Sequence, residues 1–173
     1  MNRSRPFGLL AAAAVVPLVT LAVAGCGGSN DNGSATTIKP ATNSATVSVA
    51  STGLGDILVD SQGRTLYLWE KDTGTKSTCS GACATAWPPL RVSGKPTAGS
   101  GVKASLLGTT SRSDGKPEVT YNGHPLYLYQ GDTKAGDTTG QGSTGFGAPW
   151  YVLSASGDAI TTSASSSGGG SGY

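Results

Sequence analysis

A stretch of seven residues occurs twice in this chain, and this repeat constrains the fold more than any other feature. Residues 66–72 read LYLWEKD, and residues 126–132 read LYLYQGD at an offset of 60 positions. The register extends outward, since Gly63 matches Gly123 and Thr73 matches Thr133. A shared period over this many positions indicates an internal repeat. We therefore expect two related units, repeat one at about residues 54–100 and repeat two at about 102–158.

Each copy of the motif has the pattern of a β-strand that is apolar on both faces. Side chains alternate along a strand, so Leu66 and Leu68 share one face and Tyr67 and Trp69 share the other. A strand covered on both faces is a central strand, which favours the aromatic side chains as core. An exposed aromatic platform for a sugar or another flat ligand is the alternative.

The turn signals point to the same fold class. Asp114-Gly115 and Asn122-Gly123 are strong hairpin-turn pairs. Residues 82–87 have room for a short helix, which Pro88 would stop. The prediction is an all-β fold of two pseudo-symmetric, mainly antiparallel β units, packed into one compact domain over residues 53–160 with at most short helical turns. Each unit would be marginal alone, so the two are expected to share one apolar interior.

Asp72 and Asp132 end the two copies of the motif. An aspartate at the end of a strand commonly accepts backbone N–H groups and closes a turn. Two identical turn caps explain the duplication; a catalytic pair of carboxylates is the alternative reading.

The first 25 residues have the pattern of a secretory signal peptide. Arg3 and Arg5 precede an apolar run, which ends in Leu21-Ala22-Val23-Ala24-Gly25-Cys26. The small residues before Cys26 resemble the bacterial lipobox, so cleavage would leave Cys26 as a lipidated N-terminus. Fatty-acyl chains such as palmitate would then hold the protein on the outer face of the cell membrane. An uncleaved membrane-spanning anchor is the alternative.

The remaining ends have the composition of solvated spacers. Residues 26–52 carry no aromatic side chain and are rich in Ser, Thr, Asn, Ala and Gly, which predicts a flexible tether. Residues 161–173 have the same character and predict a disordered tail. Without Arg3 and Arg5 the net charge falls from +2 to zero, and no basic patch for nucleic acid is visible.

Cys79 and Cys83 are the only cysteines besides Cys26. In an oxidising compartment a disulfide between them is the default. A copper site is the alternative, because two thiolates and the only histidine, His124, suit a soft ion. This arrangement resembles the copper site of cytochrome-oxidase assembly proteins, but those proteins are thioredoxin-like and no βαβ pattern is present here. His124 also fits a solvated position at the start of a strand.

The chain lacks the usual patterns of catalysis. It has no nucleophile-elbow serine, no HExxH, no phosphate loop and no dinucleotide fingerprint. We therefore expect a protein that is not an enzyme.

Taken together, these residues resemble the bacterial lipoprotein family called "secreted repeat of unknown function", with its motif Tyr-x-(Phe/Trp/Tyr)-x-x-Asp. The motif residues here are Tyr67, Trp69, Asp72, Tyr127, Tyr129 and Asp132. The resemblance implies an envelope location and a repeat architecture, and no cofactor comes with it. We expect a membrane-anchored, non-enzymatic lipoprotein that is structural or ligand-binding; a copper-binding or redox protein and a cell-wall glycan-binding module are the alternatives.

Overall fold

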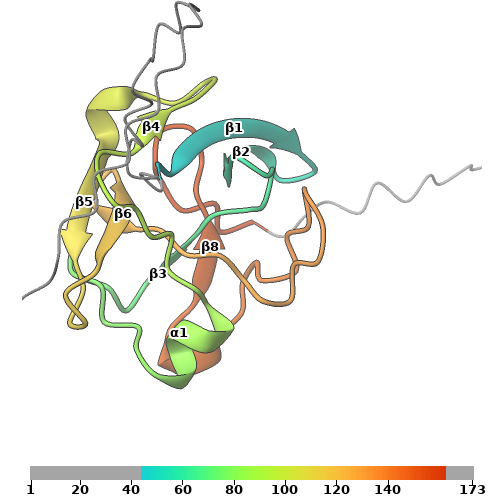
Figure 1. Ribbon diagram of the computed structural model, residues 1–173. Coiled ribbons are helices and arrows are strands. Elements are labelled where there is room, and N and C mark those ends of the chain that lie inside the picture. Colours follow the sequence, from blue (N-terminus) through green and yellow to red (C-terminus); the bar gives the residue numbers. More distant parts are fainter. Residues whose placement is uncertain (1–43, 163–173) are drawn as a thin grey trace, which may run out of the picture. The chain divides into compact units, whose positions relative to one another are not determined.

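The computed structural model describes residues 44–162 of the 173-residue chain (Figure 1). Short strands dominate this part, with one α-helix and two 3-10 turns. The strands are β1 (Thr46–Thr52), β2 (Gly55–Asp60), β3 (Tyr67–Trp69), β4 (Thr97–Ala98), β5 (Leu107–Ser111), β6 (Pro117–Tyr121), β7 (His124–Pro125) and β8 (Trp150–Val152). The helices are α1 (Ala82–Ala86), η1 (Ala104–Leu106) and η2 (Gly145–Gly147). The predicted all-β class and the short helix before Pro88 are therefore confirmed.

The strands form three small sheets, ordered β2-β1-β4, β3-β8 and β5-β6-β7. All pairings are antiparallel except that of β1 with the two-residue strand β4. The hairpin of β5 and β6 turns at Asp114-Gly115, and the hairpin of β6 and β7 turns at Asn122-Gly123. Both turn predictions are therefore correct.

Strand β1 corrects the predicted end of the tether. The composition predicts that residues 46–52 belong to the flexible spacer, but they pair with β2 over six residue pairs, and Val47 is fully buried. The physical reason is local: Thr46, Val47 and Val49 are β-branched, and Val47 and Val49 fall on one face by alternation. The absence of aromatic residues does not keep this segment out of the core.

Strand β3 of repeat one is buried on both faces, as its pattern predicts. The prediction of a corresponding strand in repeat two is wrong: β7 ends at Pro125, Tyr127 forms only isolated bridges, and Leu128 and Tyr129 are half-buried. Leu66, Leu68 and Leu126 belong to an aliphatic cluster, while Tyr67, Trp69 and Tyr127 belong to a second cluster on the opposite face. We call these the aliphatic cluster and the aromatic cluster. The buried members of the aromatic cluster are Ile57, Val59, Tyr67, Trp69, Cys79, Cys83, Trp87, Tyr127, Trp150 and Val152.

The two repeats interlock rather than pack as separate bodies. Tyr67 and Tyr127 form an antiparallel bridge in which each backbone N–H donates to the other's carbonyl, at 2.8 and 2.9 Å. Strand β3 of repeat one pairs with β8 of repeat two, and Leu90 N–H of repeat one donates to the carbonyl of Leu126 at 2.8 Å. The repeats therefore share one apolar interior, although their superposition as whole units stays a prediction.

Within residues 44–162, no helix combines the length and the apolar character that crossing a membrane requires.

Candidate functional site

The repeated Tyr and Asp residues bind each other across the repeats. Tyr127 donates its hydroxyl to Asp72 Oδ2 at 2.5 Å, and Tyr67 donates its hydroxyl to Asp132 Oδ2 at 2.7 Å. We call these two contacts the Tyr–Asp couples. Each couple joins a tyrosine of one repeat to the aspartate of the other, so the duplicated motif links the two repeats in both directions. We call this pair of links the reciprocal lock.

The second oxygen of each aspartate closes a turn. Asp72 Oδ1 accepts hydrogen bonds from the backbone N–H and the hydroxyl of Thr78, at 2.8 and 2.6 Å. Asp132 Oδ1 accepts the same pair from Thr139, at 2.9 and 2.6 Å. The turn-cap interpretation is therefore right, but it misses the tyrosine partners. The two threonines are 61 residues apart, so a search at the 60-residue offset of the motif does not find them.

Four aromatic rings stack in the aromatic cluster. Their order is Trp69, Trp150, Trp87 and Tyr129, with successive ring centroids 4.9, 3.9 and 4.2 Å apart. The planes of the two central indoles, Trp150 and Trp87, differ by 3°. We call these four rings the aromatic stack. Tyr67 meets Trp87 edge to face at 5.3 Å, and Tyr127 meets Trp150 in the same way at 5.2 Å.

A glycine fits the stack closely. A Cβ at Gly140 would lie 2.7 Å from Cη2 of Trp87, so a side chain there would push against the stack. The backbone N–H of Gly140 also donates to the hydroxyl of Tyr67 at 3.3 Å. The close approach of the backbone to Trp87 therefore requires a glycine at position 140.

The two copies of the motif differ in how deeply their residues are buried. In repeat one, Trp69 is 4% exposed and Asp72 is 8% exposed. In repeat two, Tyr129 and Asp132 are half-buried and line a pocket of about 190 Å³. The pocket is lined by Arg64, Thr65, Pro88, Leu128, Tyr129, Gln130 and Asp132, and we call it the Tyr129 pocket. Trp69 is therefore core, as predicted, and cannot serve as the alternative sugar platform, whereas its counterpart Tyr129 is partly accessible.

The Tyr129 pocket has polar groups held in place around an aromatic ring. Arg64 donates from Nε and Nη2 to Asp60 Oδ2 at 2.8 and 2.6 Å, while its side chain stays 45% exposed. Asp132 is fixed by Tyr67 and Thr139, and Gln130 is exposed at the rim. Pockets that bind small molecules combine aromatic surface with a few oriented polar groups.

A buried ion pair lies beside the Asp72 couple. Arg112 contacts Glu118 at 2.8 Å, and Glu118 is fully buried. Arg112 also donates to the hydroxyl of Ser77 and to the carbonyl of Cys79, and Ser77 in turn contacts the hydroxyl of Tyr127 at 2.7 Å. Burial raises the pKa of Glu118 to about 7, against the opposing effect of Arg112.

No motif of the sequence indicates this network. Its only signal is a glutamate inside the β-prone run Pro117–Tyr121, where a charge needs a buried partner if the strand is central.

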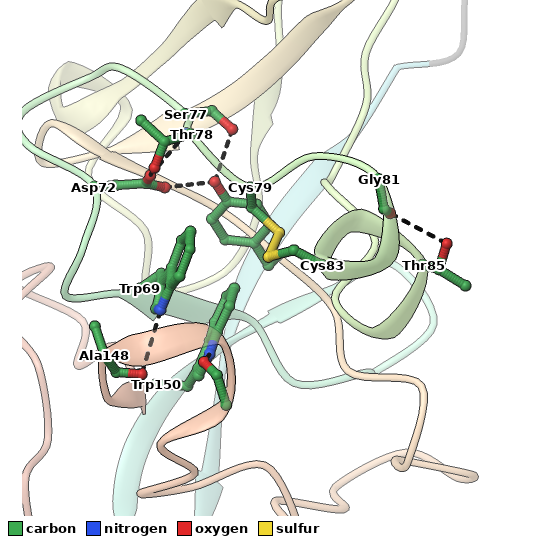
Figure 2. The surroundings of a disulfide bond; sticks show 12 residues. Trp69, Asp72, Ser77, Thr78, Cys79, Gly81, Cys83, Thr85, Ala148 and Trp150 are labelled. Carbon is green, nitrogen blue, oxygen red and sulfur yellow. Dashed lines mark hydrogen bonds between the residues drawn. A yellow bond between two sulfur atoms is a disulfide. The ribbon is translucent and has the colours of Figure 1, made fainter.

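Cys79 and Cys83 form a disulfide at the start of α1, as predicted, with 5.3 Å between their Cα atoms. Figure 2 shows the bond between α1 and the group of Asp72, Ser77 and Thr78, with Trp69 and Trp150 nearby. His124 lies in β7, opposite Tyr121. Among the described residues no three His, Cys, Asp or Glu side chains are grouped as a metal site, so the structure does not bring His124 to the cysteine pair.

Cys26 and the predicted signal peptide of residues 1–25 lie outside the described residues, as do the tether up to residue 43 and the tail from residue 163.

Comparison with known proteins identifies the repeats. A family model described as "secreted repeat of unknown function" matches residues 48–91 and 108–154, which together make up more than half of the chain. Each matched segment contains one copy of the motif, and the first begins inside β1. Searches of curated proteins and of solved structures find no significant match.

Proposed function

Because the chain belongs to the family described as a secreted repeat of unknown function, we propose that it is a non-enzymatic binding module outside the cytoplasm, anchored through a lipid on Cys26. The ligand class that we propose is a cell-wall saccharide, bound at the Tyr129 pocket.

The non-enzymatic character is supported by how the acidic side chains are used. Asp72 and Asp132 each hold a tyrosine and a threonine, and Glu118 is fully buried beside Arg112. The oxygens of both aspartates already accept hydrogen bonds and Glu118 is buried, whereas a general acid or base must reach a substrate proton.

The observation that carries the binding proposal is the partial exposure of Tyr129 within a duplicated motif whose other aromatic residues are buried. Its ring is supported from behind by Trp87 and has Arg64 and Gln130 beside it in the pocket. An aromatic ring with fixed donors and acceptors around it suits a sugar, which presents C–H groups on its faces and hydroxyls on its edge. The pocket volume of about 190 Å³ limits the ligand to one small ring at a time.

Gln130→Trp tests this binding site, because residue 130 is exposed and its indole would fill the pocket. We expect affinity for purified cell-wall polysaccharide to fall about tenfold or more. Gln62→Trp is the matched control, since Gln62 is also exposed but does not line this pocket. Equal retention of both variants and the parent chain, or no retention of any of them, would contradict the proposal.

The anchor is tested separately with Cys26→Ser in the full chain. We expect the parent protein to sediment with membranes and to carry acyl mass on its first mature residue. The variant should be released into the soluble extracytoplasmic fraction, because burial of acyl methylenes at ~0.8 kcal/mol each provides the attachment. Membrane attachment that survives the substitution would overturn the lipid anchor and leave the pocket proposal unaffected.

A further inference from the structure

We propose that the aromatic stack conducts one-electron oxidation inward from Tyr129, and that the two Tyr–Asp couples hold the resulting radical. The protein would thereby act as an electron donor towards one-electron oxidants outside the cytoplasm, such as peroxyl radicals. This inference does not rest on the proposed saccharide binding.

The path is continuous through the aromatic cluster. From half-buried Tyr129 the rings follow at 4.2 Å to Trp87, 3.9 Å to Trp150 and 4.9 Å to Trp69. Trp87 and Trp150 are almost completely buried, which keeps water from an oxidised ring. Both buried tyrosines touch this pair, Tyr67 on Trp87 and Tyr127 on Trp150. An electron missing at any ring therefore has a neighbouring aromatic ring that can supply it.

Proton acceptors decide where the radical remains. Trp150 and Trp69 donate their N–H groups to the carbonyls of Gly145 and Ala148, at 2.9 and 3.3 Å. An amide carbonyl is a very weak base, so these indoles keep their protons when oxidised. Tyr67 and Tyr127 instead donate to carboxylates. An oxidised phenol is a strong acid and loses its proton to such a base.

The step balances with one external oxidant. The oxidant takes one electron from the stack and is reduced; a peroxyl radical, for example, becomes a peroxide anion, which takes a proton from water. The stack regains the electron from Tyr127, whose O–H bond breaks as its proton moves to Asp72 Oδ2. The products are a neutral tyrosyl radical and a protonated aspartic acid, and Tyr67 with Asp132 does the same. A one-electron reductant such as ascorbate returns the electron, and the proton moves back to the phenol.

The resting state favours this chemistry as well. Burial raises the pKa of both Tyr67 and Tyr127, so each phenol keeps its proton until it is oxidised. The acceptor is within hydrogen-bonding distance before the reaction begins, at 2.7 and 2.5 Å, so no rearrangement is needed for the transfer.

Tyr121 provides a matched comparison inside the same protein. It is fully buried, but it belongs to the aliphatic cluster, and its hydroxyl donates to the carbonyl of Ala155 at 2.9 Å. It has neither the stack nor a carboxylate, so it should not hold the radical.

The test oxidises the full chain with photogenerated tris(bipyridine)ruthenium(III) and measures the radical by freeze-quench electron paramagnetic resonance. We expect a tyrosyl signal in the parent protein. In the double variant Tyr67→Phe/Tyr127→Phe this signal should fall by more than half while a tryptophan radical appears. Tyr121→Phe should leave the signal unchanged.

The single variant Tyr67→Phe covers the case in which the double variant does not fold, because its aspartate partner is half-buried and can bind water. It should lower the tyrosyl signal, and ascorbate should erase the signal in every folded variant. A tyrosyl signal that is insensitive to Tyr67→Phe, or that falls equally in Tyr121→Phe, would overturn the proposal and show the stack to be core only.

Discussion

Two residue types, Tyr and Asp, give the repeated motif its structural role. A hydrogen bond to a charged group stabilises a fold by about 1.5–3 kcal/mol, and its loss leaves a buried acceptor unsatisfied. The two couples differ in this respect, because Asp72 is buried whereas Asp132 is half-buried. The couple of Tyr127 with Asp72 should therefore contribute more than the couple of Tyr67 with Asp132.

Glu118 makes the stability of the fold depend on pH. Its pKa is raised by burial from 4.5 to about 7, so the folded protein binds its proton more tightly than the unfolded chain. The stabilisation that the proton on Glu118 gives the folded state is then complete below pH 4.5 and is lost as the pH rises through 7. We expect the free energy of unfolding, measured by urea titration, to fall by up to about 3 kcal/mol from pH 4.5 to 7 through this residue.

Glu118→Gln isolates that contribution. The amide keeps an acceptor for Arg112 but does not titrate, so the fall between pH 4.5 and 7 should shrink. Asp114, the other carboxylate near Arg112, has a pKa lowered by its hydrogen bond from Arg91 and titrates below this range. The same slope in the variant and the parent would rule out Glu118 as its source.

Among the elements, β1 and α1 show two ways in which short segments are held. Helix α1 has only five residues and is fastened by the Cys79–Cys83 disulfide, whose short loop is worth about 2 kcal/mol on the entropic account. Strand β1 has no covalent support. It lies in the middle of its sheet, between β2 and β4, and Val47 joins the aliphatic cluster.

Deleting β1 should therefore unfold the domain. A chain that begins at Gly53 loses the burial of Val47, about 2 kcal/mol, and all six pairs with β2. A chain that begins at Ser44 keeps both and should show the same thermal midpoint as the longer protein. Calorimetry of the two chains gives the comparison; a cooperative transition in the shorter one would show that β1 is dispensable.

At the scale of the whole described domain, residues 44–162, the sequence is sufficient for the fold class and for the presence of two repeats. The Asp-Gly and Asn-Gly turns and the alternation of Leu with Tyr or Trp are local signals of β-structure, and the 60-residue period indicates the duplication. The disulfide follows from the same kind of reasoning, since only two cysteines remain once Cys26 is set aside.

The contacts between the repeats could not be predicted in this way. That Tyr67 binds Asp132 rather than Asp72 depends on how the copies cross, and the sequence of one copy does not encode it. The same holds for Trp87 and Trp150, which stack on each other but are 63 positions apart and so fall outside the period. Strand β1 escapes prediction for another reason: it has no aromatic residue and is rich in Ser and Thr like the spacer before it, so its β-branched residues are its only local signal.

The most direct test of the reciprocal lock is a double-mutant cycle on Tyr127→Phe and Asp72→Asn, with unfolding free energies measured for the parent, both single variants and the double variant. Because the two side chains contact each other across the repeats, we predict a coupling energy of about 1 kcal/mol or more. Strictly additive losses in the double variant would contradict the lock between the two repeats.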